Sequence, residues 1–150
     1  PVFQAMGATV RYLGPTGTGT VAKLVNQLLV GIHSVAAAEA MLMGAKSGAD
    51  PAMIFEVVSS GWGQSFMLGR NAPVMLDRDF EGTRTQLTVF LKDILLIKGL
   101  AEELGMATPG ADLAYKEINR AVEQGLGDKD SAAIVLPMEA RAGHQIKRRS

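Results

Sequence analysis

The sequence predicts an all-α protein, a bundle of six to seven helices around one long central helix. Residues 20–46 form a long, strongly apolar stretch without a proline. Clusters of glycine and proline, which stop helices, then recur along the chain. After residue 13 the alternating pattern of a β-strand does not return. Helices packed on helices are therefore the expected architecture.

Signals for helix starts and stops place the individual elements. Asp50 is expected to cap a helix whose first residue is Pro51, and Gly105 is expected to end another. The helices are expected at residues 20–46, 51–60, from about 65, 83–104, 109–125 and 131–141. Residues 9–13 alternate in polarity and are rich in β-forming types, which predicts one short strand. The basic tail at residues 147–150 is expected to be solvated.

The composition argues against nucleic-acid, metal and membrane partners. Fifteen lysines and arginines balance 15 aspartates and glutamates, so no nucleic-acid partner is expected. The chain has no cysteine and only two distant histidines, which predicts no metal site and a reducing, cytoplasmic setting. Polar residues interrupt the apolar run at 21–43, which favours a buried helix, and no membrane partner is expected. They are Lys23, Asn26, Gln27, His33 and Glu39.

A glycine-rich segment precedes the long helix. Residues 17–22 fit the dinucleotide fingerprint G-x-G-x-x-A, and Glu39 follows at the spacing of the acidic residue that binds ribose. However, that acidic residue belongs at the end of a second strand, whereas Glu39 lies inside an unbroken helical stretch. We therefore interpret residues 14–19 as a glycine hinge that begins a helix.

The same segment contains a more specific pattern. Gly14, Gly17, Gly19, Lys23 and Asn26 have the spacing of the catalytic signature of the β-hydroxyacid dehydrogenases, and the chain resembles that family. The family includes 3-hydroxyisobutyrate dehydrogenase and 2-hydroxy-3-oxopropionate reductase. Three further motifs follow in the family's order, at residues 75–80, 92–94 and 126–133. Two departures are Gln27, where several relatives have a second asparagine, and residues 81–83, where the family often has Pro-Gly-Phe.

The resemblance implies a domain organisation and a cofactor. Residues 1–13 would be a remnant of an N-terminal Rossmann domain, including its last strand, and residues 14–150 the helical substrate and dimerisation domain. NAD or NADP would be bound mainly by the missing N-terminal domain, so the isolated chain is expected to be inactive. The complete enzyme would transfer a hydride between nicotinamide and a small β-hydroxy acid or its semialdehyde. Such substrates include 3-hydroxyisobutyrate, tartronate semialdehyde and a sugar acid such as threonate.

The resemblance also implies roles for individual residues. Lys23 would be the catalytic acid and base, and helical spacing places Asn26 and Gln27 beside it on one face. The residues expected to bind substrate are Asn26, Gln27 and Phe66. Lys92 and Asp93 would bind the cofactor. Free N–H groups of the first helical turn and apolar neighbours are expected to surround the Lys23 amine.

The candidate site residues also have simpler structural interpretations. Without the resemblance, Lys23 is a surface lysine, Lys92 and Asp93 form a solvated edge, and Phe66 is a packing residue. The chain could also be a non-catalytic helical dimerisation module. Residues 21–43 and 83–104 are apolar on all faces, which predicts a homo-oligomer, a dimer or tetramer. Loss of contact with a Rossmann domain would expose the same surface.

Overall fold

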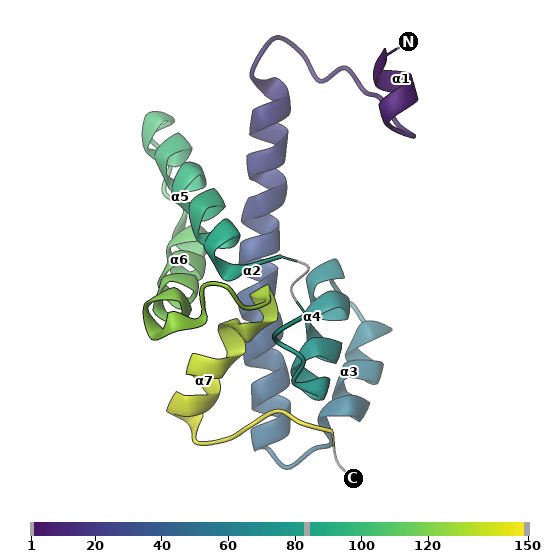
Figure 1. Cartoon of the computed structure of the whole chain (residues 1–150), viewed down its shortest axis with the longest axis vertical. Coiled ribbons are helices and arrows are strands. Elements are labelled where there is room, and N and C mark those ends of the chain that lie inside the picture. The colour runs from purple at the N-terminus through teal and green to yellow at the C-terminus, as the bar shows by residue number, and fades with distance from the viewer. Residues whose placement is uncertain (1, 83–84, 149–150) are drawn as a thin grey trace.

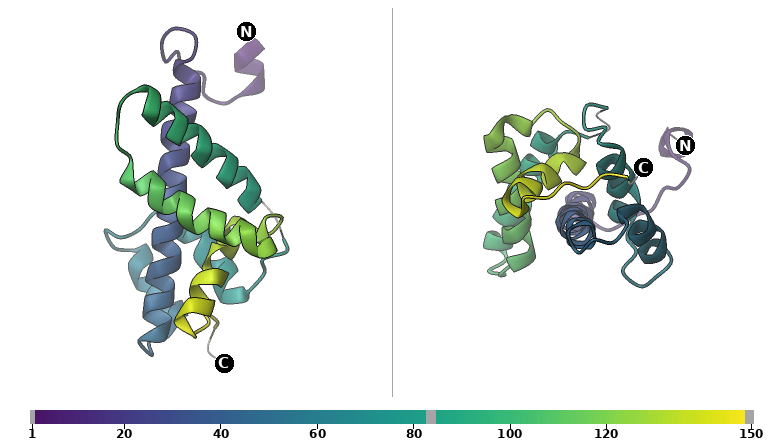
Figure 2. Two further views of the ribbon diagram at one scale, coloured as in Figure 1. Left: turned by 90° about the vertical axis from the view of Figure 1, so that its left-hand side faces the viewer. Right: turned by 90° about the horizontal axis from the view of Figure 1, so that it is seen from below.

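One long helix organises the described part of the chain. The computed structural model describes residues 2–82 and 85–148. Helix α2 (Thr18–Lys46) runs through the centre (Figure 1). Helices α3 (Pro51–Ser59) and α4 (Phe66–Asp77) pack on one side of it, and α5 (Leu87–Glu103) and α6 (Pro109–Ala121) pack on the other. Figure 2 shows α2 end-on between these two layers. A 3₁₀ turn (Ser131–Ile134) and α7 (Val135–Ala142) complete the bundle, which confirms the predicted all-α class.

Most helix ends follow the local signals. Asp50 caps α3 through a 2.9 Å hydrogen bond from the Ala52 amide, with Pro51 at the first helical position. The Ser65 hydroxyl accepts a 3.0 Å hydrogen bond from the Leu68 amide and caps α4. Helix α6 continues into a π-helical turn (Val122–Leu126), which closes at Gly125 with a φ of 80°. These boundaries agree with the prediction because each depends on residues adjacent in the sequence.

The predicted strand at residues 9–13 is not formed. The chain instead begins with α1 (Val2–Met6) and continues as an exposed segment without regular structure to α2 (Figure 1). In the described ranges the one β-bridge joins Gln86 to Asp130. A strand is stabilised by hydrogen bonds to a neighbouring strand, and residues 9–13 have no such neighbour among the residues described.

Helix α5 starts later than predicted. Its first residue is Leu87, and the predicted start at residues 83–84 lies outside the described residues. The Thr85 carbonyl accepts a 2.9 Å hydrogen bond from the Ser131 amide, which holds the preceding segment in a pairing with a distant loop. The start of α5 at Leu87 thus depends on a contact with a distant segment, which the apolar pattern of residues 83–104 cannot predict.

The C-terminal tail is anchored as far as it is described. Ile146 is fully buried, and its amide donates a 2.7 Å hydrogen bond to Glu139. The Arg148 amide donates to the Leu76 carbonyl, and its guanidinium donates a 2.6 Å hydrogen bond to Asp77. Lys147 and Arg148 are exposed, as the prediction of a solvated tail requires, but Arg148 is also tied to the bundle by these hydrogen bonds.

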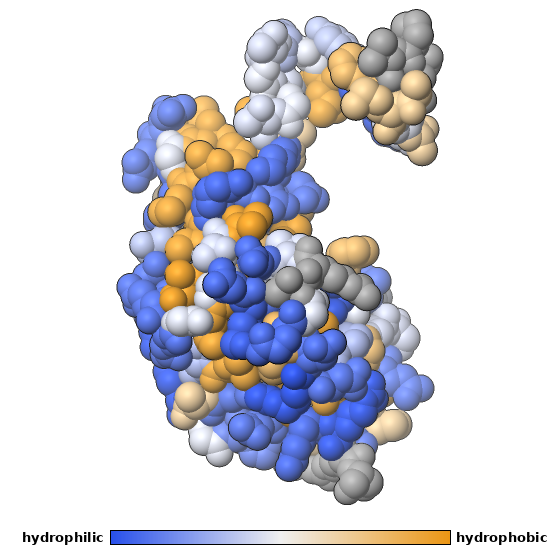
Figure 3. Space-filling model, in the orientation of Figure 1, coloured by the Kyte–Doolittle hydropathy of each residue, from blue (hydrophilic) through white to orange (hydrophobic). Residues whose placement is uncertain are grey.

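The two halves of α2 differ in burial. Its C-terminal half is part of the core, with Val35, Ala38 and Met41 almost completely buried. Figure 3 shows apolar surface over the end of the bundle where α5 lies beside the N-terminal half of α2. The large exposed apolar residues of α5 and of the N-terminal half of α2 are Val21, Val25, Leu29, Val89, Leu95 and Leu96. Within this chain, the N-terminal half of α2 is thus partly exposed.

Helix α2 is also the one described helix that is long and apolar enough to cross a membrane. In its most apolar window, 44% of the residues are buried inside the bundle. The core helix of a soluble protein passes the same test of length and composition.

Candidate functional site

The glycine segment acts as a hinge at the start of α2. Gly14 and Gly17 have φ values of 127° and 98°, in the left-handed region that favours glycine. Gly17 occupies the N-cap position, and α2 continues without interruption past Glu39. The prediction that this glycine segment begins a helix is therefore confirmed, and Lys23 lies in the second turn of α2.

Three predicted site residues meet across the interface of α2 and α5. Lys23 Nζ donates a 2.8 Å hydrogen bond to Asp93 Oδ1. Gln27 Nε2 donates a 2.7 Å hydrogen bond to Asp93 Oδ2. Both oxygens of one carboxylate thus bind side chains from successive turns of α2. We call Lys23, Gln27 and Asp93 the α2–α5 triad.

Asp93 is the buried member of the triad. Its side chain is 6% exposed, and its residue is part of the packed face of α5. Burial raises the pKa of the Asp93 carboxyl. Hydrogen bonds from Lys23 and Gln27 and the charges of Lys23 and Lys92 lower this pKa by a larger amount. The resulting pKa of Asp93 lies below its ordinary value. Asp93 is therefore an anion at neutral pH and holds two donors in fixed directions.

Lys23 and Lys92 lie on the solvent side of Asp93. The Lys23 side chain is 52% exposed, so its amine is not enclosed by apolar neighbours as the sequence suggested. Lys92 is 65% exposed, and its Nζ lies 3.8 Å from Asp93 Oδ1. Two ammonium groups thus flank one carboxylate and leave one excess positive charge at an open edge.

Asn26 is joined to the triad through Gln27. Asn26 Nδ2 donates a 3.1 Å hydrogen bond to Gln27 Oε1 while Gln27 Nε2 donates to Asp93. Both ends of the Gln27 amide are therefore engaged by protein groups. Asn26 is exposed and retains its own carbonyl oxygen for a further partner.

Phe66 does not join this group. It is the first residue of α4, and the residue is 84% exposed. Among the described contacts, none links Phe66 to Lys23, Gln27 or Asp93. The sequence carries no signal for the distance between Phe66 and Lys23, because α4 and α2 are separate segments.

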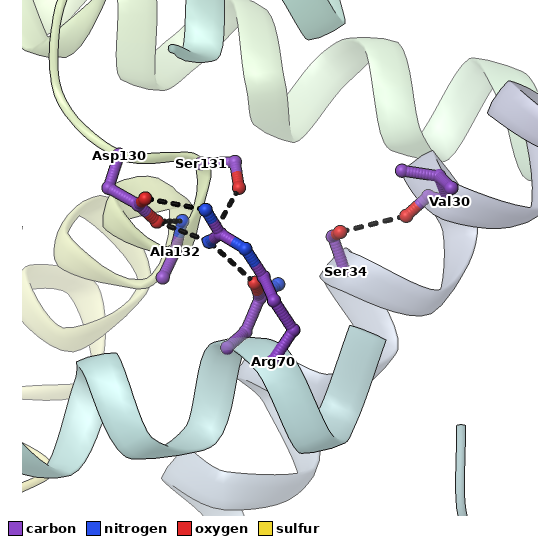
Figure 4. Close-up of polar contacts among 7 residues, drawn as sticks. Val30, Ser34, Arg70, Asp130, Ser131 and Ala132 are labelled. Atoms are coloured by element: carbon purple, nitrogen blue, oxygen red, sulfur yellow. Dashed lines mark hydrogen bonds and ion pairs between the residues drawn. The ribbon is translucent and has the colours of Figure 1, made fainter. Parts of the chain in front are cut away.

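A second polar cluster, buried between α4 and the segment before α7, was not singled out from the sequence. Arg70 forms an ion pair with Asp130 through both of its terminal nitrogens, and Arg70 Nη2 lies 2.6 Å from Asp130 Oδ2. Arg70 Nη1 also donates 3.0 Å hydrogen bonds to the oxygens of Asn71 and Ser131. Figure 4 shows Arg70 reaching from its helix to this segment, with the Ser34–Val30 hydrogen bond nearby. Only the role of Asp130 as a helix cap had a local signal, and its 2.9 Å bond from the Ala132 amide confirms it.

A cavity of about 1080 Å³ lies at the opposite end of α2 from Lys23. It lies between the end of α2 and the C-terminal tail, and none of the triad residues line it. Its arginines already have partners, since Arg78 binds Glu139 and Arg148 binds Asp77. Lys46 donates to the Ala142 carbonyl. These cations anchor the tail to the bundle.

Comparison with known proteins places the triad in a family context. The family model described as "NAD-binding of NADP-dependent 3-hydroxyisobutyrate dehydrogenase" matches residues 17–138, a range that includes every candidate site residue. The chain is 31% identical to the L-threonate dehydrogenase of Cupriavidus necator over 135 residues, 89% of this chain and 45% of that protein. It is 27% identical to the 2-hydroxy-3-oxopropionate reductase of Escherichia coli strain K12, over 97% of this chain and 50% of that protein.

The fold has a counterpart among solved structures. The crystal structure of a 3-hydroxyisobutyrate dehydrogenase from Salmonella typhimurium superposes with a TM-score of 0.86 at 31% identity. The match covers 91% of this chain and 48% of that one. The chain therefore spans about half the length of the relatives it matches.

Proposed function

Because the chain belongs to the NAD-binding family of 3-hydroxyisobutyrate dehydrogenases, we propose that it is the helical part of an NAD(P)-dependent oxidoreductase. The complete protein would oxidise a small hydroxy acid or reduce its semialdehyde. In oxidation the neutral Lys23 amine would take the hydroxyl proton, and in reduction the Lys23 ammonium would give a proton to the carbonyl oxygen. The contacts of Lys23 in this chain and the names of its relatives support this proposal for the complete protein.

The observation that carries the proposal is the contact between Lys23 and Asp93. A general acid or base acts well only when its reacting atom is held within hydrogen-bond reach of the substrate. Asp93 holds the Lys23 amine by a 2.8 Å hydrogen bond while half of the Lys23 side chain remains exposed. The amine is therefore fixed in direction yet accessible to a small molecule.

The charge at this edge supports an anionic substrate. With Lys23 in its ammonium form, Lys23 and Lys92 carry two positive charges against the single negative charge of Asp93. A hydroxy acid brings a carboxylate that can neutralise the excess charge. Candidate substrates are 3-hydroxyisobutyrate, tartronate semialdehyde and a sugar acid such as threonate, in line with the names of the relatives.

Asn26, Gln27 and Phe66 would bind the substrate. Asn26 would orient the substrate oxygen with its free carbonyl, and Gln27 would act beside it in the wall of the site. Phe66 would contact the substrate through its exposed ring. Their assignment as substrate-binding residues rests on the family resemblance and on the placement of Asn26 and Gln27 beside Lys23.

The nicotinamide cofactor, when bound, supplies or accepts the hydride. The exposed ammonium of Lys92 fits a partner of this kind, because it lies beside the triad and is not enclosed by the bundle. Lys92 would hold the cofactor end nearest the triad. Asp93 would keep Lys92 and Lys23 on the same edge by its charge.

The decisive experiment replaces the amine in a complete protein that carries this chain. We expect Lys23→Met to lower kcat by roughly 10²- to 10⁴-fold, the usual contribution of a general acid or base. The matched control is Lys98→Met on α5, because Lys98 also pairs with a carboxylate, that of Asp112, but lies outside the triad. Unchanged kcat in Lys23→Met would contradict the assignment.

The same experiment addresses the alternative of a non-catalytic dimerisation module. Turnover of any of the candidate substrates by the complete wild-type protein excludes a purely structural role. A protein that binds neither NADH nor NADPH, measured by fluorescence titration, would favour that alternative.

A further inference from the structure

The first turn of α5 is capped by a distant loop. Gln86, its N-cap residue, makes no side-chain capping hydrogen bond. Instead, the Leu87 amide donates to the Lys129 carbonyl and the Thr88 amide donates to the Gly127 carbonyl, each at 3.1 Å. Two of the four N–H groups that an α-helix leaves unpaired at its start are thus satisfied by residues 127–129.

This capping loop fits tightly against α5. A Cβ atom placed on Gly127 would lie 2.9 Å from Thr88 Cγ2, closer than real Cβ contacts. A side chain at residue 127 would therefore require Thr88 to shift. Movement of this loop would move the start of α5 with it.

The buried Arg70–Asp130 ion pair fixes the capping loop to the opposite layer. Asp130 follows Lys129 directly, and its side chain is 1% exposed. Its amide also donates a 2.9 Å hydrogen bond to the Phe80 carbonyl. The other partner, Arg70, belongs to α4, which packs on α2. The ion pair thus connects α4 through the loop to the first turn of α5.

Asp93 follows Leu87 by six residues in the same uninterrupted helix. A helix transmits a displacement of its first turn to the next two turns, because successive turns share hydrogen bonds. We propose that Arg70 is a positioning residue for Asp93, acting through Asp130 and the capping loop. These contacts are sufficient for Arg70 to position Asp93. An effect of Arg70 on catalysis rests in addition on the proposed function.

The test compares three variants of the chain by NMR. Arg70→Met removes the ion pair, Arg70→Lys keeps the charge with fewer hydrogen bonds, and Arg78→Met is the matched control. Arg78 also binds a buried carboxylate, that of Glu139, through both terminal nitrogens, but its hydrogen-bond partners lie on α7 and at Ile146 and not on the capping loop. The readouts are amide hydrogen exchange at Leu87 and Thr88 and titration of the Asp93 carboxyl, which faces Lys23 and Lys92.

In Arg70→Met we expect exchange at Leu87 and Thr88 to accelerate by about tenfold or more, as local opening becomes easier. The Asp93 carboxyl should titrate closer to the ordinary aspartate range, as its contact with Lys23 loosens. Arg70→Lys should lie between Arg70→Met and wild type, and it provides the same comparison if Arg70→Met does not fold. Arg78→Met should leave both readouts unchanged.

Two results would overturn the inference. One is wild-type exchange and titration in Arg70→Met or, if that variant does not fold, in Arg70→Lys. The other is an equal change in Arg78→Met, which would indicate general loosening of the bundle. In the complete enzyme, Arg70→Lys should lower kcat with little change in KM. If the NMR readouts change but kcat does not, the positioning of Asp93 stands and the catalytic role of Lys23 is contradicted.

Discussion

Lys23 Nζ and Asp93 Oδ1 lie 2.8 Å apart although 70 positions separate the two residues in the chain. The contact joins the glycine-led start of α2 to the middle of α5. Because Asp93 also accepts from Gln27, it fixes two side chains of α2 at once.

Replacing the carboxylate should disable the site without unfolding the protein. In a complete protein that carries this chain, we expect Asp93→Asn to lower kcat about 10²-fold, the loss that a misplacement of roughly 1 Å can cause. The control is Asp112→Asn, which removes an exposed partner of Lys98 and should leave kcat unchanged. Steady-state kinetics of both variants provide the measurement, and equal activities would contradict the role of Asp93.

The same residue predicts a pH dependence of stability. The pKa of Asp93 is lowered in the folded chain, so the carboxylate stabilises the fold fully above the unfolded-state pKa of about 3.9. This stabilisation is lost as the pH falls through the lower, folded-state pKa. The difference in unfolding free energy between wild type and Asp93→Asn should be constant from about pH 7 to pH 5 and shrink below about pH 4. Urea titrations at several pH values measure it, and a difference that grows in acid would contradict the prediction.

Lys92 should act on cofactor binding more than on chemistry. Its side chain is 65% exposed and its ammonium lies 3.8 Å from Asp93, too far for a strong hydrogen bond. We expect Lys92→Met to raise the KM for NAD(P) several-fold, while kcat and thermal stability stay close to wild type. Initial rates at varied cofactor concentration decide this, and an unchanged cofactor KM would remove Lys92 from the cofactor site.

The 150-residue chain by itself should show no dehydrogenase turnover. The described residues contain helices and turns but none of the strand–helix–strand units that bind dinucleotides. One exposed lysine, Lys92, does not hold a cofactor. Absorbance of NADH and NADPH at saturating hydroxy acid provides the measurement. Turnover that co-purifies with the chain and disappears in Lys23→Met would refute this prediction.

The apolar end of the bundle should mediate self-association. Val25 and Leu29 are exposed on the N-terminal half of α2, beside exposed leucines of α5. Contiguous exposed apolar surface of this kind usually marks an interface. We expect a dimer or larger oligomer that Val25→Asp weakens, while Met43→Asp, at an exposed position in the other half of α2, does not. Light scattering tests this, and a wild-type mass of 15.9 kDa at micromolar concentration would refute it.

Much of the fold was determined by the sequence itself. The start of α3 follows from Asp50 and Pro51, and the start of α4 follows from Ser65, because a capping side chain binds an amide two or three residues away. The neighbourhood of Lys23, Asn26 and Gln27 was predictable for the same reason. Residues three and four apart on a helix share a face, whatever surrounds that helix.

Only the tertiary structure decided the rest. It paired Asp93 with Lys23 and Gln27, moved the start of α5 to Leu87, anchored Arg148 and left residues 9–13 without a strand. Each of these outcomes depends on a group from a different segment, or on the lack of one. The sequence pattern reports the periodicity within a segment, whereas pairing between segments depends on how the helices pack, and packing is a property of the whole chain.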